Sequence, residues 1–440
     1  MKIHFIGIGG IGLSALAKFL AGRGHTISGS DMRQSEITDD LALNYGAKIT
    51  IPHHPDAVEG ADRVIYSAAV RPSNVEYQRA RELGIELLSR KEALKYILED
   101  KEVYAVGGAH GKSTTSAMLA ALLPETNALI GAISKEFGSN VRSAENDRVV
   151  FEADESDESF LNSHPYLAIV TNVEPEHMEY YEYDETRFYN AYRQFLQLAE
   201  IRVLNGDDPF LASLAGEMKS HYLYPSREIK DLELVLVDGE PHTRFTLRDL
   251  GSFEVFGFGA HIALDAALAI LAAIELGEKP EALRERLRNY RGIKKRFDMI
   301  QNDENLVVID DYGHHPTEIF VTLEALKHFQ KMRRLPRLKA IWQPHKYTRT
   351  LDNLKGFVDC FEGVDELVIL PIWSAGEIEI PIDLKGAFAR YQPIMADRVT
   401  REGGVVKILD RQGQVIREFR EGLVAAFGAG DITYQIRGEG

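Results

Sequence analysis

The chain has 440 residues, of which 45% are hydrophobic and 27% are charged, a composition typical of a packed globular protein with more than one domain. Its 51 Lys and Arg residues against 67 Asp and Glu residues give a net charge of −16, which makes a nucleic acid an unfavourable partner. The single cysteine, Cys360, excludes an internal disulfide and a CxxC metal site, so it indicates a reducing compartment.

No apolar run approaches the roughly 20 residues that a helix needs to cross a bilayer. The N-terminal apolar stretch is rich in glycine and contains Lys18, which argues against a secretory signal. We therefore expect a cytoplasmic protein without membrane insertion.

The first 98 residues are predicted to form a Rossmann-like α/β domain. A strand at Ile3–Ile6, a glycine turn, a helix at Leu13–Gly22 and a second strand at Thr26–Gly29 make a βαβ unit. The pattern recurs further along, at Arg63–Ser67, Asn74–Leu83 and Glu86–Leu88. The charged stretch that follows, residues 98–102, is expected to be a linker.

Residues 99–293 are predicted to form a central α/β domain of the P-loop ATPase type. The strand Val103–Val106 runs into the glycine loop Gly108–Lys112, which opens a helix at Ser113–Leu123. Further buried strands are expected at Arg148–Glu152, Leu167–Thr171 and Arg202–Leu204, and a helix at Ile262–Leu276.

Residues 294–440 are predicted to form a third, Rossmann-like domain. Its expected strands are Leu306–Ile309, Lys339–Trp342 and Glu366–Leu370, and it ends near Phe427–Asp431. The fold class is therefore α/β, with three α/β domains in tandem.

The glycines of Gly7–Gly12 follow a strand and open a helix, and Asp31 lies about 20 residues further on. Such glycines let backbone N–H groups approach a diphosphate at a helix N-terminus, while the acid accepts from a ribose hydroxyl. Taken alone, the pattern indicates NAD or FAD, but any nucleotide diphosphate satisfies the same geometry, and a tight strand-to-helix turn also remains open.

The segment Gly108–Thr114, which reads GAHGKST, is more specific. A loop ending in Gly-Lys-Ser/Thr cradles phosphates with N–H donors, places an ammonium near the β- and γ-phosphates and offers a hydroxyl to Mg²⁺. Counted from Gly107, the loop reads GxxxGKS, which is one residue shorter than the full GxxxxGK[ST] spacing. We nevertheless expect it to bind ATP.

Acidic residues and a histidine follow the next two strands of the central domain. Glu152 stands where an apolar strand ends, and His177 follows the strand that ends at Thr171. A solvated acidic loop is the ordinary interpretation of such a charge run. The position of both residues at strand ends favours oxygen and imidazole ligands for Mg²⁺ instead.

The third domain repeats this arrangement. Asp310–His315 follows one apolar strand and His345–Arg349 follows another, while Lys295 and Arg296 precede the first of them. Either segment could be a polar loop. Together they indicate a site that receives an anionic ligand.

In their order along the chain, these motifs resemble those of the Mur ligases of peptidoglycan synthesis. The resemblance covers essentially the whole chain and rests on GIGGIG, GSD, GAHGKST, FEADESD, TNVEPEHM, KKRF, DDYGHHPTE, WQPHKYTRT and GAGDI. It implies an ATP-dependent ligase that joins L-alanine to the carboxylate of UDP-N-acetylmuramate through an acyl phosphate, with ATP and Mg²⁺ as cofactors.

The resemblance also implies residue roles. The UDP-sugar set is Gly9, Gly10, Ile11, Gly12, Ser30, Asp31, His53, Ser67, Asn140 and Asn172. The ATP set is Gly108, Ala109, His110, Gly111, Lys112, Ser113, Thr114, Asp265 and Arg296. The metal set is Ser113, Glu152 and His177, and the amino-acid set is Tyr312, His314, Lys346 and Arg349. The catalytic set is Lys112, His177, Asp311 and His314.

Several positions depart from the family pattern, and two of them bear on ligand recognition. Asp265 stands in place of an asparagine on the adenine side and can accept a hydrogen bond but cannot donate one when ionised. Lys346 stands where an arginine is usual and lacks the bidentate geometry of a guanidinium.

Three other functions stay open from the sequence. They are a ligase that joins a murein tripeptide to the same UDP-sugar, an NAD-dependent dehydrogenase and a nucleotide switch without ligase activity.

Overall fold

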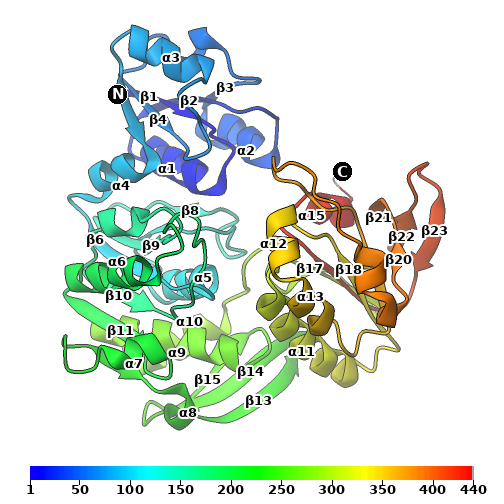
Figure 1. Ribbon diagram of the computed structural model, residues 1–440. Helices are drawn as coiled ribbons and strands as arrows, with labels where there is room; N and C mark the ends of the chain where they lie inside the picture. Colours follow the sequence, from blue (N-terminus) through cyan, green and yellow to red (C-terminus); the bar gives the residue numbers. More distant parts are fainter. Residues whose placement is uncertain (439–440) are drawn as a thin grey trace. The chain divides into compact units, whose positions relative to one another are not determined.

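In the computed structural model, which describes residues 1–438, the chain forms two compact units (Figure 1). The first comprises Met1–Glu233, Arg244–Val255 and Ala260–Gly292, and the second comprises Leu234–Thr243, Phe256–Gly259 and the chain from Ile293 onward. Two large α/β sheets lie in the first unit and one in the second, so the predicted class of three tandem α/β domains is confirmed. The boundaries of the three domains stay a prediction.

The first sheet consists of five parallel strands in the order β3-β2-β1-β4-β5. The strands are β1 (Lys2–Ile6), β2 (Thr26–Ser30), β3 (Lys48–Thr50), β4 (Arg63–Tyr66) and β5 (Glu86–Ser89). The helices are α1 (Ile11–Gly22), α2 (Glu36–Tyr45), α3 (Val75–Glu82) and α4 (Arg90–Leu98). The chain winds outward from β1 in one direction and from β4 in the other, so the carboxyl ends of these two strands form a switch point where such sheets bind ligands.

The second sheet has seven strands in the order β12-β11-β10-β6-β9-β7-β8. They are β6 (Glu102–Gly107), β7 (Asn127–Leu129), β8 (Val141–Arg142), β9 (Arg148–Glu152), β10 (Leu167–Val170), β11 (Ile201–Asn205) and β12 (His221–Leu223). Its helices are α5 (Lys112–Leu122), α6 (Glu185–Leu198), α7 (Pro209–Ser213), α8 (Pro225–Glu228), α9 (Ala260–Glu275) and α10 (Pro280–Arg288). All pairs are parallel except β7 with β8, and β6 lies between β9 and β10, so three strand ends meet beside the glycine loop.

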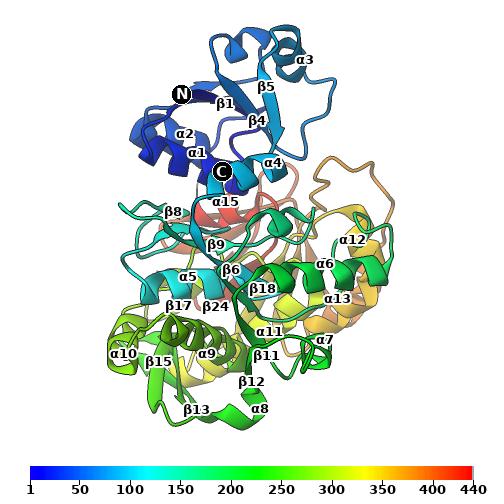
Figure 2. The ribbon, with the colours of Figure 1, turned by 90° about the vertical axis from the view of Figure 1, so that its left-hand side faces the viewer.

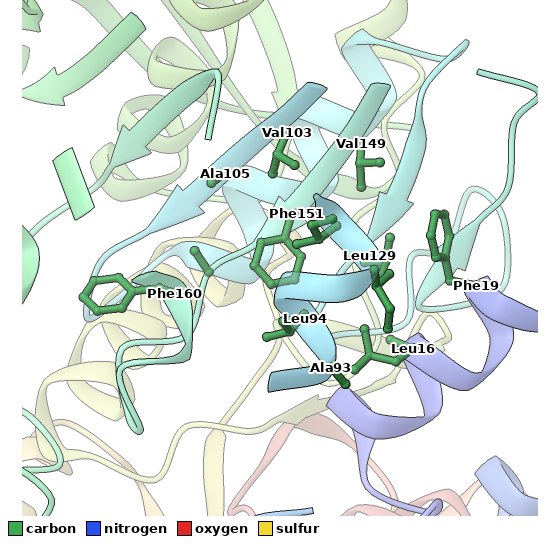
Figure 3. Packing of buried hydrophobic residues seen from close by; sticks show 14 of the residues in the cluster. Leu16, Phe19, Ala93, Leu94, Val103, Ala105, Leu129, Val149, Phe151 and Phe160 are labelled. Atoms are coloured by element: carbon green, nitrogen blue, oxygen red, sulfur yellow. The ribbon is translucent and has the colours of Figure 1, made fainter. Parts of the chain in front are cut away.

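A shared hydrophobic core joins these two sheets. Helices α1 and α4 lie on the side of the first sheet that faces the second (Figure 2). Leu16 of α1 and Leu94 of α4 belong to one buried cluster with Val149 and Phe151 of β9 (Figure 3). Each of these side chains is at most 4% exposed, and burying one stabilises the fold by about 1.5–3 kcal/mol. The helix that starts at the first glycine loop is therefore fixed against the sheet that carries the second.

The third sheet has the order β16-β17-β24-β18-β19-β20, with β16 antiparallel to β17 and the other pairs parallel. The strands are β16 (Asp298–Asn302), β17 (Leu306–Asp311), β18 (Leu338–Trp342), β19 (Glu366–Ile369), β20 (Ile394–Met395) and β24 (Gly422–Phe427). The helices are α11 (Pro316–Arg333), α12 (Tyr347–Asp352), α13 (Leu354–Cys360), α14 (Leu384–Ala387) and α15 (Ile432–Arg437). Trp342 is fully buried in this core and contacts the rings of Phe357, Phe361 and Phe388.

Two smaller sheets complete the fold, and the strands of the second are antiparallel. The first consists of β13 (Ile229–Val237), β14 (Glu240–Leu247) and β15 (Ser252–Phe256), and the second of β21 (Arg398–Glu402), β22 (Val405–Leu409) and β23 (Val415–Phe419). The helices found within residues 1–438 are all too short or too polar to cross a membrane.

The structure corrects one strand end. The sequence placed Asp310 and Asp311 after a strand ending at Ile309, but both are the last residues of β17 and both are buried. They remain in the strand because each has buried partners. Asp310 accepts from Thr433 and Arg437, and Asp311 accepts from the backbone N–H groups of Phe297 and Gly313.

The shared core makes a quantitative prediction. Replacing Leu16 by Ala should lower the free energy of unfolding by about 2–5 kcal/mol, because the cavity lies between two packed layers. Leu43 of α2 is 83% exposed, so Leu43→Ala is the matched control and should change the stability by less than about 0.5 kcal/mol. Urea denaturation followed by far-UV circular dichroism measures both. Equal effects of the two substitutions would contradict the packing described here.

Candidate active site

The first glycine loop lies at the switch point of the first sheet. Gly7 follows β1 with a positive φ of 83°, and a Cβ there would lie 2.9 Å from the Ser67 hydroxyl, so this position requires glycine. The Gly9 N–H donates to Oδ2 of Asp31 at 2.9 Å, and Gly10 is the N-cap of α1. The loop thus leads directly into a helix N-terminus, which favours a phosphate group.

The structure brings the polar residues of the predicted UDP-sugar set to this edge of the sheet. Ser30 is the last residue of β2, Asp31 follows it, and Ser67 follows β4. The Ser30 hydroxyl lies 2.8 Å from Nδ1 of His53. Ile11 and Gly12 are the first two residues of α1.

Asn140, which is predicted to lie near the sugar, is bonded to helix α1. It is fully buried, its Nδ2 donates to the carbonyl of Ile11 at 2.9 Å, and its Oδ1 accepts from Lys18 at 3.0 Å. The Asn140 amide therefore ties the loop before β8 to α1, and its contact with a sugar stays a proposal.

The second glycine loop connects β6 to α5. Gly108 and Gly111 both have positive φ, at 133° and 81°, and Cβ atoms there would collide with Thr171 and Asp265. The segment that follows β10 holds the loop, because the His110 N–H donates to Oδ1 of Asn172 at 2.9 Å. Asn172, predicted to lie near the sugar, thus supports the phosphate loop. Asp265 of α9, a residue of the predicted ATP set, lies beside Gly111.

Lys112 is the first residue of α5, and Ser113 and Thr114 follow it. Its ammonium donates to the carbonyls of Gly108 and Ala109 at 2.6 and 3.2 Å and lies 3.0 Å from the carboxylate of Glu155. Burial alone would lower the pKa of Lys112, but the charges of Glu155 and Asp154 outweigh it, so the pKa is raised. Burial raises the pKa of Glu155 to about 7 although Lys112 opposes it.

Ser113 and Glu152 form a second pair behind the loop. The Ser113 hydroxyl donates to Oε1 of Glu152 at 2.9 Å, while Oε2 accepts from the Gly131 N–H at 2.6 Å. Burial raises the pKa of Glu152 despite these bonds. A hydroxyl and a buried carboxylate in contact are hard oxygen donors, so the pair fits Mg²⁺.

His177 lies with other acids than Glu152. Ligand atoms of His177, Glu155 and Glu176 all lie within 4.8 Å of one another, a spacing that could hold a cation. His177 has a left-handed backbone conformation with φ 53°, which costs of order 1–3 kcal/mol and is frequent at functional sites. Sequence reasoning selected His177 but did not assign a role to Glu155 or Glu176.

In the second unit, Asp311, Arg296 and Tyr312 are neighbours. Burial raises the pKa of Asp311 to about 6, although the charge of Arg296 opposes it. The Arg296 guanidinium lies 3.0 Å from Glu318 and 5.5 Å from the ring centre of Tyr312. Sequence reasoning gave no role to Glu318, which lies inside helix α11 like an ordinary surface acid.

The remaining residues of the amino-acid set gather around two imidazoles. The ring of His314 lies 5.3 Å from that of Tyr312 and 6.0 Å from that of His345, and Arg349 lies 3.1 Å from Nδ1 of His345. Burial, reinforced by the neighbouring cations, lowers the pKa of both histidines to about 4. Lys346 is the N-cap of α12 and has a strained φ of 68°. The neutral imidazoles of His314 and His345 and the cations of Lys346 and Arg349 form a site that can bind a carboxylate.

Comparison with known proteins agrees with this arrangement. Residues 2–102 match the Mur ligase family, catalytic domain, residues 106–230 the Mur ligase middle domain, and residues 295–418 the Mur ligase, glutamate ligase domain. The UDP-N-acetylmuramate–L-alanine ligase of Campylobacter curvus is 54% identical over 438 residues, covering 99% of each chain. That of Helicobacter pylori is 50% identical and covers 100% of this chain and 96% of the relative.

Solved structures show the same relationship. The crystal structure of the UDP-N-acetylmuramate-alanine ligase of Thermotoga maritima has a TM-score of 0.81 at 27% identity and covers 99% of this chain and 97% of the other. A murein peptide ligase of Psychrobacter arcticus shares the fold with a TM-score of 0.65 at 19% identity, covering 98% and 96%. Three domains of the family match this chain, and relatives that align over its full length are more than 50% identical to it in sequence. This chain therefore belongs to the Mur ligase family.

Proposed function

We propose that this protein joins L-alanine to the muramoyl carboxylate of UDP-N-acetylmuramate, with conversion of ATP to ADP and phosphate. The observation that carries the proposal is the phosphate loop with Lys112 and the Ser113–Glu152 pair, in a chain that aligns over its whole length with ligases of this name. The free, buried Cys360 is consistent with a reducing compartment, and we propose a cytoplasmic location.

The first step activates the carboxylate. A carboxylate is a poor electrophile, so one of its oxygens bonds to the γ-phosphorus of ATP while the bond to ADP breaks, giving an acyl phosphate. Phosphoryl transfer depends on alignment and charge neutralisation. Lys112 supplies a cation at the loop, and the N–H groups at the start of α5 supply donors.

We propose that Ser113 and Glu152 hold Mg²⁺; His177, predicted in the same set, lies instead with Glu155 and Glu176. The bound ion would neutralise phosphate charge. The pair provides hard oxygen donors. Burial raises the pKa of Glu152, and a bound cation would favour its ionised carboxylate.

The second step forms the amide bond. The ammonium of L-alanine first loses one proton to solvent. Its amino nitrogen then bonds to the acyl carbon while the bond from that carbon to the phosphate oxygen breaks, and the nitrogen gives up a second proton, which the released phosphate takes up. We propose that Arg349 and Lys346 hold the carboxylate of the amino acid, beside His314 and Tyr312. With its pKa lowered to about 4, His314 is uncharged at neutral pH and adds no repulsion toward an incoming ammonium.

Turnover with alternative acceptors tests the proposal. Purified protein given ATP, Mg²⁺ and UDP-N-acetylmuramate should release ADP when L-alanine is added, and should do so much more slowly with the murein tripeptide L-Ala-γ-D-Glu-meso-diaminopimelate. A preference for the tripeptide would assign the recycling reaction instead. No ADP with either acceptor would refute the ligase proposal.

Substitution of Lys112 tests the phosphate loop. Lys112→Ala should lower the rate of ADP formation at least about 100-fold, equivalent to roughly 3 kcal/mol of transition-state stabilisation. The fold should survive, because Glu155 has a pKa of about 7 and can take up a proton when the ammonium is absent. Lys95→Ala, at an exposed site in α4, is the control. More than a tenth of the original rate in Lys112→Ala would exclude a direct role.

The Ser113–Glu152 pair makes a prediction about metal dependence. Glu152→Gln keeps the shape but removes the charge, so the Mg²⁺ concentration that gives half-maximal rate should rise at least about tenfold. Glu145→Gln, at an exposed position, should leave it unchanged. A Mg²⁺ titration of the rate for the three proteins compares them. An unchanged Mg²⁺ requirement in Glu152→Gln would remove this residue from the metal set.

A further inference from the structure

A buried carboxylate lies under the predicted nucleotide site of the first sheet. Glu76, the second residue of α3, is fully buried. Its Oε1 accepts from the backbone N–H of His54 at 2.8 Å, and its Oε2 accepts from the Ser30 hydroxyl at 2.5 Å and lies 3.1 Å from Nε2 of His4. Nδ1 of His4 in turn lies 2.9 Å from the hydroxyl of Ser28.

Glu76 is ionised in this environment. Burial opposes ionisation, but the hydrogen bonds from His4, Ser30 and the backbone of His54 outweigh it, so the pKa of Glu76 is lowered. Its position in the first turn of a helix also favours a negative charge. An ionised carboxylate can only accept hydrogen bonds.

This fixes the direction of each proton in the network. Ser30 has one hydroxyl proton, and it is donated to Glu76. In the hydrogen bond of 2.8 Å between the Ser30 oxygen and His53, Nδ1 of His53 must then be the donor. In its neutral form His53 then carries its single proton on Nδ1, and its Nε2 has a lone pair. No hydrogen bond to that nitrogen is found among residues 1–438, and the His53 side chain is 12% exposed.

We propose that Glu76 is a positioning residue that holds His53 in the Nδ1–H tautomer, so that Nε2 presents a hydrogen-bond acceptor to a donor group of uridine. The inference rests on the proposed binding of a UDP-sugar at this sheet. The donor is either the ring N–H of uracil or a ribose hydroxyl, since both carry a proton that a lone pair on nitrogen accepts.

An isosteric substitution should reverse the network. In Glu76→Gln the amide oxygen must take the place of Oε1, because the backbone N–H of His54 can only donate. The amide NH₂ then faces Ser30 and donates to it. Ser30 in turn donates its proton to Nδ1 of His53, which changes His53 to the Nε2–H tautomer. The nucleotide then meets a donor where it previously met an acceptor.

The tautomer can be read directly by ¹⁵N NMR of protein labelled at its 14 histidines, with His53 assigned from a His53→Gln variant. We expect Nδ1–H in the unmodified protein and Nε2–H in Glu76→Gln. An Nε2–H tautomer in the unmodified protein would overturn the inference without any substitution, so the test does not depend on the variant folding.

Calorimetry with nucleotide analogues tests the consequence for binding. UDP should bind about 10- to 100-fold more weakly to Glu76→Gln, because a donor faces a donor. In the unmodified protein, N3-methyl-UDP should bind at least about tenfold more weakly than UDP if the ring N–H is the partner of His53. If a ribose hydroxyl is the partner, 2′- or 3′-deoxy-UDP should bind more weakly by the same factor. That difference should largely disappear in Glu76→Gln.

The controls separate this inference from the proposed reaction. Glu82→Gln makes the same exchange at an exposed position in the last turn of α3 and should leave UDP binding and the analogue preference unchanged. Equal binding of all analogues to the unmodified protein, or the same discrimination in Glu76→Gln, would overturn the inference. His53 could be Nδ1–H in the unmodified protein and Nε2–H in Glu76→Gln, with the expected analogue preference, while no ligation product forms. That result would support the inference and refute only the proposed function.

Discussion

The ammonium of Lys112 lies between the carbonyls of Gly108 and Ala109 and the buried carboxylate of Glu155, and the proposed chemistry of the central sheet depends on this contact. Lys112 donates hydrogen bonds to two carbonyls of its own loop, so the loop is ordered before a phosphate binds. Because the pKa of Glu155 is about 7, this acid can lose its partner to a phosphate and take up a proton. The cation can therefore move to the ligand without leaving an uncompensated buried charge behind.

The first two sheets share one core, and this links the two glycine loops. Helix α1 begins at the first loop and packs with Leu16 against the layer that contains Phe151, whose strand leads to Glu152. Asn140 adds a hydrogen bond from the central sheet to Ile11 at the start of the same helix. Groups placed at strand ends over a close-packed core lose little freedom on binding, which is the condition for efficient phosphoryl transfer.

The glycine loops and strand ends could be predicted from sequence, because glycine spacing and apolar runs are local signals. The acids that support the sites could not be predicted. Glu76 and Glu318 lie in helices, where the sequence does not distinguish a buried acid from an exposed one. Only the fold shows that Glu76 accepts from Ser30 and Glu318 from Arg296. Helix α2 was missed although Ser35 and Gly46 cap it, because its apolar face is short. Local patterns give the position of a residue but not the partner that its side chain meets across the fold.

The central claim is that the muramoyl carboxylate attacks ATP before the amino acid reacts. The fate of the carboxylate oxygen tests this most directly. UDP-N-acetylmuramate labelled with ¹⁸O in its carboxylate should be incubated with ATP, Mg²⁺ and L-alanine, and the released phosphate analysed by mass. The account predicts one ¹⁸O atom in each phosphate, transferred when the C–O bond of the acyl phosphate breaks. With both carboxylate oxygens labelled, the amide keeps one ¹⁸O atom in any mechanism, so unlabelled phosphate, with the other ¹⁸O atom in AMP or in water, would contradict it.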